Sequence, residues 1–479
     1  MWQSTNWRFL LPDPANTVSL LGPPCARAPE GHGIALAPTD SSEPARVVLA
    51  DPNCLAAAIQ SGADQIIVAG RTPASRLRRH GYDVTRVLTL PTRANPMLML
   101  PLNHPNAYRY AFDNLVFPRT LLKRARKRLV GRTLGVVVPP NLPILTLAQK
   151  RRRAPFFLAA AVEFGVPTHS HWFLRIGQGS ALTRSSFFAF APESPQPGWI
   201  IKFARFPDCD DRFDADERGL TLAREAGTIV ARHAPQLLGR FEVGDLAASV
   251  ETAALGKPLV DVLLAPGSRR RKLALIEDVA AWIVEFGVAT LAPSESTRAE
   301  CLRIEKEVLP LAAVERGAEL LERVHGVGAV LQHNDLGCWN IVVDHRHFSA
   351  LDWEAARRHG FPLWDLWLFL SDALATLDRT TREERSRYFV RLFLGELPSS
   401  AVLFSWTRRA VQALRLPAET VGPLASLCWL HHASSERKTH SNLTKRGLST
   451  DVPSQVMLTL PKLWLKEPGL GPDWNRWND

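Results

Sequence analysis

The sequence predicts an α+β fold with a small β-rich lobe, a large helical lobe, and a small α/β domain in front of them. Three observations support this prediction. Residues 46–90 alternate short strand-like runs with helix-like segments, residues 172–251 carry closely spaced apolar runs, and residues after 259 follow a helical period almost throughout. We therefore expect an α/β region at 1–150, the β-rich lobe at 165–251 and the helical lobe at 252–479.

Size and charge limit the classes of protein. With 479 residues, of which 46% are hydrophobic, the chain can bury two or three cores and is neither disordered nor fibrous. The formal charge of +11 favours anionic partners such as nucleotides or phosphorylated metabolites. The six cysteines lack a Cys-x-x-Cys spacing, so neither a disulfide framework nor a zinc site is predicted. Because no signal peptide or membrane-spanning stretch is visible, we expect a soluble cytoplasmic protein.

The first 150 residues predict a non-catalytic α/β region. An irregular, Pro- and Gly-rich entry holds one short strand near Thr17–Leu21, and the elements expected after it are strands at 46–50, 65–70 and 84–90 and helices at 54–62 and 73–81. Such alternation favours parallel strands, but no Gly-x-Gly-x-x-Gly turn is present to bind phosphate. We therefore expect removal of this region to spare nucleotide binding. The stretch from Leu77 to Val84, with the Pro-rich residues after it, resembles the closing portion of a methyltransferase domain.

Basic runs at 123–128, 150–153 and 269–272 are interpreted as solvated helix faces or linker ends, and the alternative is a contact with an anionic surface or nucleic acid. They are not interleaved with aromatic residues and match no nucleic-acid-binding module. We expect no specific nucleic-acid partner.

The β-rich lobe should contain strands at 172–176, 186–190, 199–203 and 247–251 and one helix at 215–234. The turn after the first strand contains Gly177, Gly179 and Ser180, and such a turn lets backbone N–H groups approach phosphates closely. Lys202 lies within an apolar strand, where its charge costs free energy unless it meets an anion. These residues indicate a phosphate-binding lobe.

The chemistry is concentrated in residues 331–354. A polar loop with His333, Asp335 and Asn340 precedes an apolar strand at 341–343, a turn, and a second apolar run at 348–351 that ends on Asp352. Phosphoryl transfer needs a carboxylate to orient the attacking hydroxyl and hard oxygen ligands to hold magnesium against a triphosphate. Asp335 suits the first role, and Asn340 and Asp352 suit the second.

The spacing His-x-Asp-x-x-x-x-Asn, with an Asp closing the next strand, resembles the catalytic loop and metal-binding Asp of the kinase superfamily. Leu-Asp-Trp-Glu in place of Asp-Phe-Gly, and Gly360-Phe-Pro-Leu-Trp-Asp365-Leu after it, most resemble the aminoglycoside phosphotransferase and choline kinase branch. Two residues depart from the pattern of that branch. Asn334 stands where the branch usually has Gly, and Trp339 is a bulky neighbour of Asn340.

The resemblance implies a two-lobed protein-kinase-like fold, ATP and Mg²⁺ as cofactors, and transfer of the γ-phosphate to a hydroxyl of a small molecule. It implies that Asp335 and His333 form the catalytic loop, with Asp365 supporting it from the next helix. In such folds a strand Lys, here Lys202, holds the α and β phosphates and pairs with a helix Glu.

Two helix residues, Glu217 and Glu225, are candidates for that Glu. The residues around Glu217 resemble the family's helix more closely, whereas Glu225 lies nearer the apolar face of a helical wheel. We favour Glu217. The resemblance also places the adenine-binding backbone near Glu251 to Ala253.

Two other classes of protein stay open. A non-catalytic pseudokinase acting as a nucleotide sensor or scaffold would usually have lost the Asp, Asn or Lys, and all three are present. A protein kinase is disfavoured because no Ala-Pro-Glu segment exists and little room for an activation loop separates Asp352 from Asp365. No segment identifies the acceptor, although an anionic acceptor fits the positive charge slightly better than a polycationic aminoglycoside. His431 and His432 are interpreted as helix-surface residues rather than as a metal site.

Overall fold

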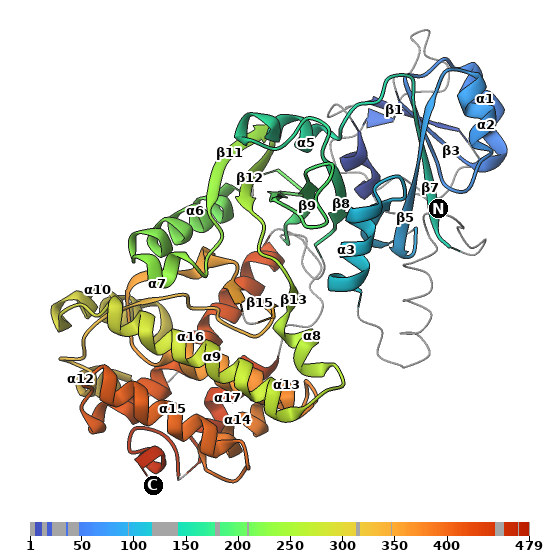
Figure 1. Cartoon of the computed structure of the whole chain (residues 1–479). Coiled ribbons are helices and arrows are strands. Elements are labelled where there is room, and N and C mark those ends of the chain that lie inside the picture. The colour runs from blue at the N-terminus through green and yellow to red at the C-terminus, as the bar shows by residue number, and fades with distance from the viewer. Residues whose placement is uncertain are drawn as a thin grey trace. The chain divides into compact units, whose positions relative to one another are not determined.

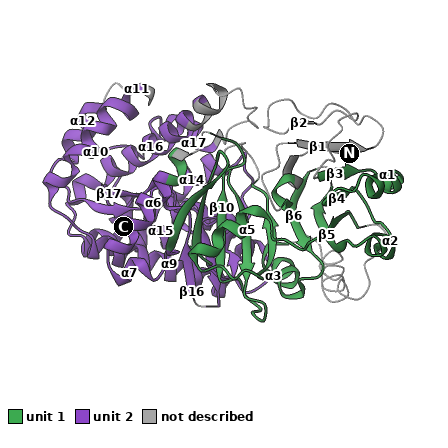
Figure 2. Ribbon diagram, turned by 90° about the horizontal axis from the view of Figure 1, so that it is seen from above, with its two compact units in different colours: residues 1–213, 237–253 green, residues 214–236, 254–479 purple. Residues whose placement is uncertain are grey.

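The computed structural model describes residues 5–11, 17–21, 35–36, 47–93, 95–116, 142–177, 183–207, 210–312, 317–345, 347–445, 455–467 and 469–478. The chain divides into two compact units (Figure 2), unit 1 comprising 1–213 and 237–253 and unit 2 comprising 214–236 and 254–479. The predicted α+β class is confirmed, since unit 1 is built on a large sheet and unit 2 is mostly helical (Figure 1). No helix in these described ranges is long and apolar enough to cross a membrane.

Unit 1 contains one twelve-stranded sheet. Its strands, in spatial order, are β11 (Leu237–Val243), β12 (Leu246–Thr252), β10 (Trp199–Phe203), β9 (Ser185–Phe190), β8 (His171–Arg175), β6 (Pro96–Pro101), β5 (Asp83–Pro91), β7 (Ile144–Gln149), β4 (Gln65–Val68), β3 (Val47–Ala50), β1 (Thr17–Leu21) and β2 (Ala35–Leu36). Strands β6 and β8 pair antiparallel, with Met99 opposite Leu174. The α/β region and the β-rich lobe therefore share one sheet across the predicted boundary.

The front of this sheet has the predicted alternation. β1, β3 and β4 are parallel, and the helices between and after them are α1 (Leu55–Gln60) and α2 (Ala74–Arg79). β7 then runs antiparallel to both β4 and β5, and the helix α3 (Pro105–Leu115) lies between β6 and β7 in the chain. The likeness of this region to the end of a methyltransferase domain stays a prediction.

The β-rich end of the sheet is antiparallel and contains the four predicted strands, together with β11, which the sequence analysis missed. The side chains of β11 are nearly all half-buried, so no alternation marks the strand. Aromatic rings fill the core beneath these strands. Phe9, from the 3-10 turn at Thr5–Leu10, has its ring centroid 4.7 Å from that of Phe203 on β10, and Phe157 stacks on the same ring at 4.2 Å. The N-terminal turn is thus part of this core.

The helix expected at 215–234 is interrupted, so that prediction was wrong in its extent. The chain forms α6 (Asp210–Glu225) and a separate short helix α7 (Thr228–Ala231). Between them Gly227 has φ of 92° and ψ of −179°, a backbone conformation that glycine adopts readily and that interrupts the helix.

Unit 2 is organised around α13 (Trp364–Leu377), all of whose residues are buried. It packs against α8 (Leu259–Leu264), α9 (Arg269–Ala289), α14 (Arg385–Phe393), α15 (Ser400–Ala413) and α16 (Ala418–Lys445). The other helices are α10 (Arg298–Arg303), α11 (Leu309–Ala312), α12 (Gly317–Arg323) and α17 (Gln455–Trp464). A π-helical turn at Ile304–Val308 separates α10 from α11.

The paired histidines of α16 were wrongly placed on a helix surface. His431 is 4% exposed and His432 is 8% exposed. The reason is that α16 packs against α11, α12, α13 and α17 and so lies inside the helical body. Burial lowers the pKa of His432 to about 4 and holds that of His431 well below its usual range, which keeps both rings neutral near pH 7.

Candidate active site

The loop predicted to carry the chemistry leaves β14 (Val330–Gln332) and enters a hairpin of β15 (Ile341–Asp344) and β16 (His347–Ala350). In this hairpin Ile341 lies opposite Ala350. β15 also pairs with β13 (Lys257–Pro258), and β14 pairs with β17 (Arg357–Gly360). The hairpin brings the loop and Asp352, two residues after β16, to the same end of the sheet.

Asn340 is bonded directly to Asp335. Its Nδ2 donates to the backbone carbonyl of Asp335 (2.8 Å) and to Oδ2 of the same residue (3.0 Å). The carboxamide oxygen of Asn340 therefore points away from Asp335. Trp339, between them in the chain, does not crowd this pair, because its indole is 45% exposed and rests on Gly337, where a Cβ would lie 2.5 Å from the ring.

Asp335 and Asp352 are close enough to affect each other's charge. Desolvation by the surrounding protein atoms raises the pKa of Asp335 to about 7, and the Asp352 carboxylate adds to this rise, although the residue as a whole is exposed. Asp352 has a left-handed backbone (φ 56°, ψ 63°), which is rare for a residue with a side chain and is typical of functional positions.

The donor set fits magnesium. Mg²⁺ prefers hard oxygen ligands and usually takes one or two carboxylates, with phosphate and water completing its shell. The Asp352 carboxylate and the Asn340 amide oxygen are such ligands, and a cation there would relieve the repulsion between Asp352 and Asp335. In the described part of the chain no cluster of three or more His, Cys, Asp or Glu side chains could hold a metal without such outside ligands.

His333 is fully buried and neutral. Burial lowers its pKa to about 4, its Nε2 lies 2.8 Å from the Leu351 carbonyl, and its Nδ1 lies 3.4 Å from the backbone N–H of Asp335. A neutral ring can donate from Nε2 and accept at Nδ1. Both ring nitrogens thus bond to backbone on either side of the site, which suits a positioning role better than proton transfer.

Two aspartates of α13 hold the loop backbone. Asp365 accepts the N–H of His333 (2.6 Å) and the N–H of Asn334 (2.8 Å), and burial raises its pKa to about 6. Asp372 accepts the N–H of Cys338 (2.9 Å) and pairs with Arg385. Asp365 was predicted, but Asp372 was missed. Its signal was visible, because two carboxylates seven residues apart in an otherwise apolar helix lie on one face.

The unusual Asn334 is explained by its backbone. Its φ is 68°, in the left-handed region that glycine adopts freely and that asparagine tolerates better than most residues. Its side chain also donates to the Ala355 carbonyl (3.2 Å), which glycine could not do. The departure from the family pattern therefore keeps the loop conformation.

Unit 1 holds the second group of predicted residues. Nζ of Lys202 lies 2.8 Å from Oε1 of Glu251, and their side chains are 11% and 2% exposed. Glu251 was expected to act through its backbone near the hinge, so this ion pair adds a side-chain role that was missed. The two residues lie on neighbouring strands, two positions apart in register, and only β-pairing brings them together. In the backbone stretch that was expected to bind adenine, the N–H of Ala253 donates to the Gly198 carbonyl (3.0 Å).

In the predicted glycine turn, the structure describes Gly177. A Cβ at this position would lie 2.4 Å from the Arg184 carbonyl oxygen, so only glycine fits. Gly179 and Ser180 lie outside the described residues. On α6, Glu225 pairs with Arg358 and Glu217 is half-buried. Pairing of Lys202 with Glu217 stays a prediction.

No protein-family model and no curated protein sequence matches the chain. Solved structures do. A glucosamine kinase in complex with glucosamine, ADP and inorganic phosphate is 13% identical over 61% of this chain and 85% of its own, with a TM-score of 0.30. An aminoglycoside-3'-phosphotransferase of type VIII is 16% identical over 54% of this chain and 99% of its own, with a TM-score of 0.31. The bifunctional kinase-methyltransferase WbdD is 12% identical over 77% of this chain and 69% of its own, with a TM-score of 0.28. Scores this low leave the functional assignment to the residues of the site.

Proposed function

We propose that this protein is a Mg²⁺-dependent phosphotransferase that moves the γ-phosphate of ATP to a hydroxyl of a small molecule. The observation that carries the proposal is the clustering at the end of the β15–β16 hairpin. There Asp335 and Asn340 are hydrogen-bonded, Asp352 lies close enough to raise the pKa of Asp335, and Asp365 bonds two successive backbone N–H groups of the loop. A buried hairpin without chemistry would not need three acidic groups at one end.

In the proposed reaction the acceptor oxygen attacks the γ-phosphorus, the bond from that phosphorus to the bridging oxygen breaks, and ADP leaves. Asp335 orients the acceptor hydroxyl and takes its proton. Asn340 keeps the Asp335 carboxylate in one orientation through its Nδ2 bond. His333 and Asp365 hold the loop backbone, so the carboxylate is positioned before the substrate binds.

Asn340 and Asp352 would hold the magnesium ion, which supplies positive charge to the phosphate oxygens when bound. In unit 1, Lys202 is the residue assigned to the α and β phosphates, with its charge offset by Glu251. Such a pair keeps the ammonium charged inside an apolar sheet until a phosphate group competes for it. The glycine turn containing Gly177 would approach the phosphates with its backbone.

The site indicates only the chemical class of the acceptor. A carboxylate base serves an alcohol hydroxyl, and the net positive charge of the chain favours an acceptor with anionic groups. No feature of the described residues supports a sensor or scaffold role over catalysis.

The test is to incubate the purified protein with ATP, Mg²⁺ and pooled metabolites and to identify the phosphorylated product by its mass. The matched control is Asp335→Asn, which keeps the shape of the side chain and removes the base. We expect a product 80 mass units heavier than its acceptor, formed by the parent and reduced by at least about 100-fold in the variant. Tight Mg-ATP binding with no product from any pool would instead favour a nucleotide sensor.

A further inference from the structure

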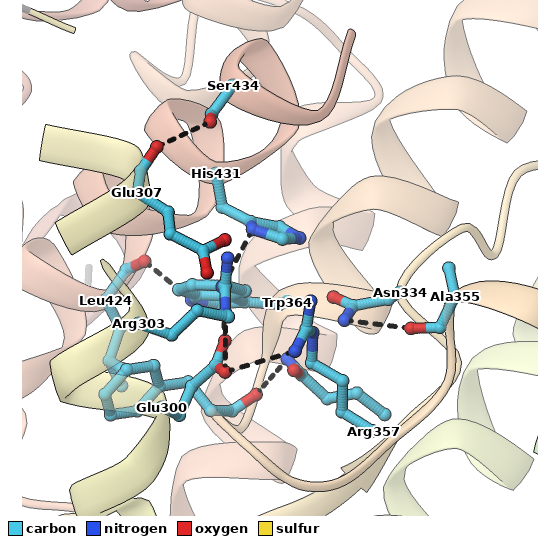
Figure 3. A network of polar contacts seen from close by, with 12 residues as sticks. Glu300, Arg303, Glu307, Asn334, Ala355, Arg357, Trp364, Leu424, His431 and Ser434 are labelled. Carbon is cyan, nitrogen blue, oxygen red and sulfur yellow. Dashed lines mark hydrogen bonds and ion pairs between the residues drawn. The ribbon is translucent and has the colours of Figure 1, made fainter. Parts of the chain in front are cut away.

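Side chains, as well as the pairing of β17 with β14 in which Gln332 lies opposite Arg357, join the segment after Asp352 to the rest of unit 2. Asn334, in the catalytic loop, donates to the Ala355 carbonyl at 3.2 Å. Two residues further on, Nη1 of Arg357 lies 3.7 Å from Oε2 of Glu300 on α10 (Figure 3). The segment after Asp352 is therefore bonded to the catalytic loop at Ala355, paired with β14 at Arg357, and joined through the Arg357 side chain to a buried carboxylate of the helical body.

That charge is already satisfied without Arg357. Glu300 is 4% exposed, and Arg303, one turn along the same helix, binds it with two hydrogen bonds, Nε to Oε2 at 2.8 Å and Nη2 to Oε1 at 2.5 Å. Such a fork neutralises a buried carboxylate by itself. The contact between Glu300 and Arg357 therefore does more to orient Arg357 than to stabilise Glu300.

The same group of residues reaches the other side of the catalytic loop. Nη2 of Arg303 lies 3.1 Å from Nδ1 of His431, whose ring stacks on Trp364 with centroids 5.1 Å apart (Figure 3). Trp364 is followed by Asp365, which accepts the loop N–H groups of His333 and Asn334. One buried network thus contacts both the segment after Asp352 and the helix end that holds the loop.

We propose that Glu300 is a positioning residue of the phosphoryl-transfer site, which acts through Arg357 to set the place of Asp352. This inference rests on the proposed function. Residues that orient metal ligands typically change metal affinity or activity by about 10- to 100-fold when they are replaced. Loss of the contact should therefore weaken the part of ATP binding that depends on Mg²⁺ and spare the part that does not.

The first variant is Arg357→Met, which keeps an apolar stem, removes the guanidinium, and leaves Glu300 paired with Arg303, so folding should be retained. We expect calorimetric ATP affinity to fall about tenfold with Mg²⁺ and to stay within twofold of the parent without it. Glu300→Gln should act in the same direction, although it also weakens the bonds from Arg303. The double variant should bind Mg-ATP no more weakly than Glu300→Gln alone, because the contact with Arg357 is already lost in that variant.

The matched control is Lys438→Met, which removes a cation from the half-exposed Lys438–Glu307 pair (2.5 Å) nearby on α16. It should leave Mg-ATP affinity unchanged. The inference is overturned if Arg357→Met keeps its Mg²⁺-dependent affinity within twofold of the parent, or if the losses of the two single variants add in the double. If the parent itself binds no Mg-ATP, the proposed function fails, and the inference fails with it. If Glu300→Gln does not fold, Arg357→Met decides alone.

Discussion

The ion pair between Lys202 and Glu251 offers a test in which stability and function separate. Nζ of Lys202 and Oε1 of Glu251 are 2.8 Å apart, and the two side chains are 11% and 2% exposed. Breaking such a buried pair from one side leaves an uncompensated charge and costs about 3–5 kcal/mol, whereas replacing both partners with apolar residues of similar size is often nearly neutral. Lys202→Met and Glu251→Leu should each destabilise the protein, and the double variant should be more stable than either.

Two measurements on the same proteins complete the test. Urea denaturation gives the free energy of unfolding, and calorimetry gives the affinity for Mg-ATP. The double variant should regain stability but not ATP affinity, because the phosphate-binding charge is gone. The control is Arg152→Met, which breaks a largely exposed pair with Asp83 (3.9 Å) in the same unit and should cost at most about 1 kcal/mol. Additive losses in the double variant, or unchanged ATP affinity in Lys202→Met, would refute the reasoning.

Three further predictions follow from the site and the sheet. The pKa of Asp335, raised to about 7, lies above the unfolded value near 4, so the protein should lose stability as the pH rises from about 4 to about 7, and the loss should be complete above that. Asp335→Asn should therefore melt at a higher temperature than the parent at pH 8 but not at pH 3.5, and a difference in melting temperature that does not change with pH would contradict this. Turnover by the parent should rise with pH, and Mg²⁺ should move the midpoint of that rise to lower pH. Asp335→Asn should lower kcat with Mg-ATP affinity retained, whereas Asp352→Asn should lose both, as calorimetry with and without Mg²⁺ will show; equal loss in the two variants would count against separate roles. Phe9→Ala should lower the free energy of unfolding by about 3–5 kcal/mol in urea, since this 1% exposed ring packs on Phe203; a loss under about 1 kcal/mol would show that the N-terminal turn is dispensable.

The last of these predictions changes the expectation for residues 1–150. From the sequence alone their removal should spare nucleotide binding. In the structure their deletion would take β6 from the edge of β8 and Phe9 from the core beneath β10. We now expect such a truncation to destabilise the β-rich end of the sheet, whether or not the deleted residues contact a nucleotide.

Local sequence was sufficient for the features that local physics controls. The strands at 186–190 and 199–203 and the hairpin after Asn340 follow from hydrophobic period and turn residues, so they were placed within a few positions. The candidate residues His333, Asp335, Asn340 and Asp352 were found for the same reason, because they lie close together in the chain around one short hairpin.

Tertiary structure alone decided the partners. Glu251 meets Lys202 across two strands, Asp372 reaches Cys338 from a helix 34 residues away, and Arg357 meets Glu300 on α10. Long-range pairing depends on which surfaces pack together. The sequence pattern of a carboxylate in an apolar helix is the same whether that carboxylate bonds to a loop or to solvent. The sequence by itself determined which groups are candidates for the chemistry. The tertiary structure decided which residues hold them, because a buried polar side chain needs a hydrogen-bond partner and the fold decides which one is within reach.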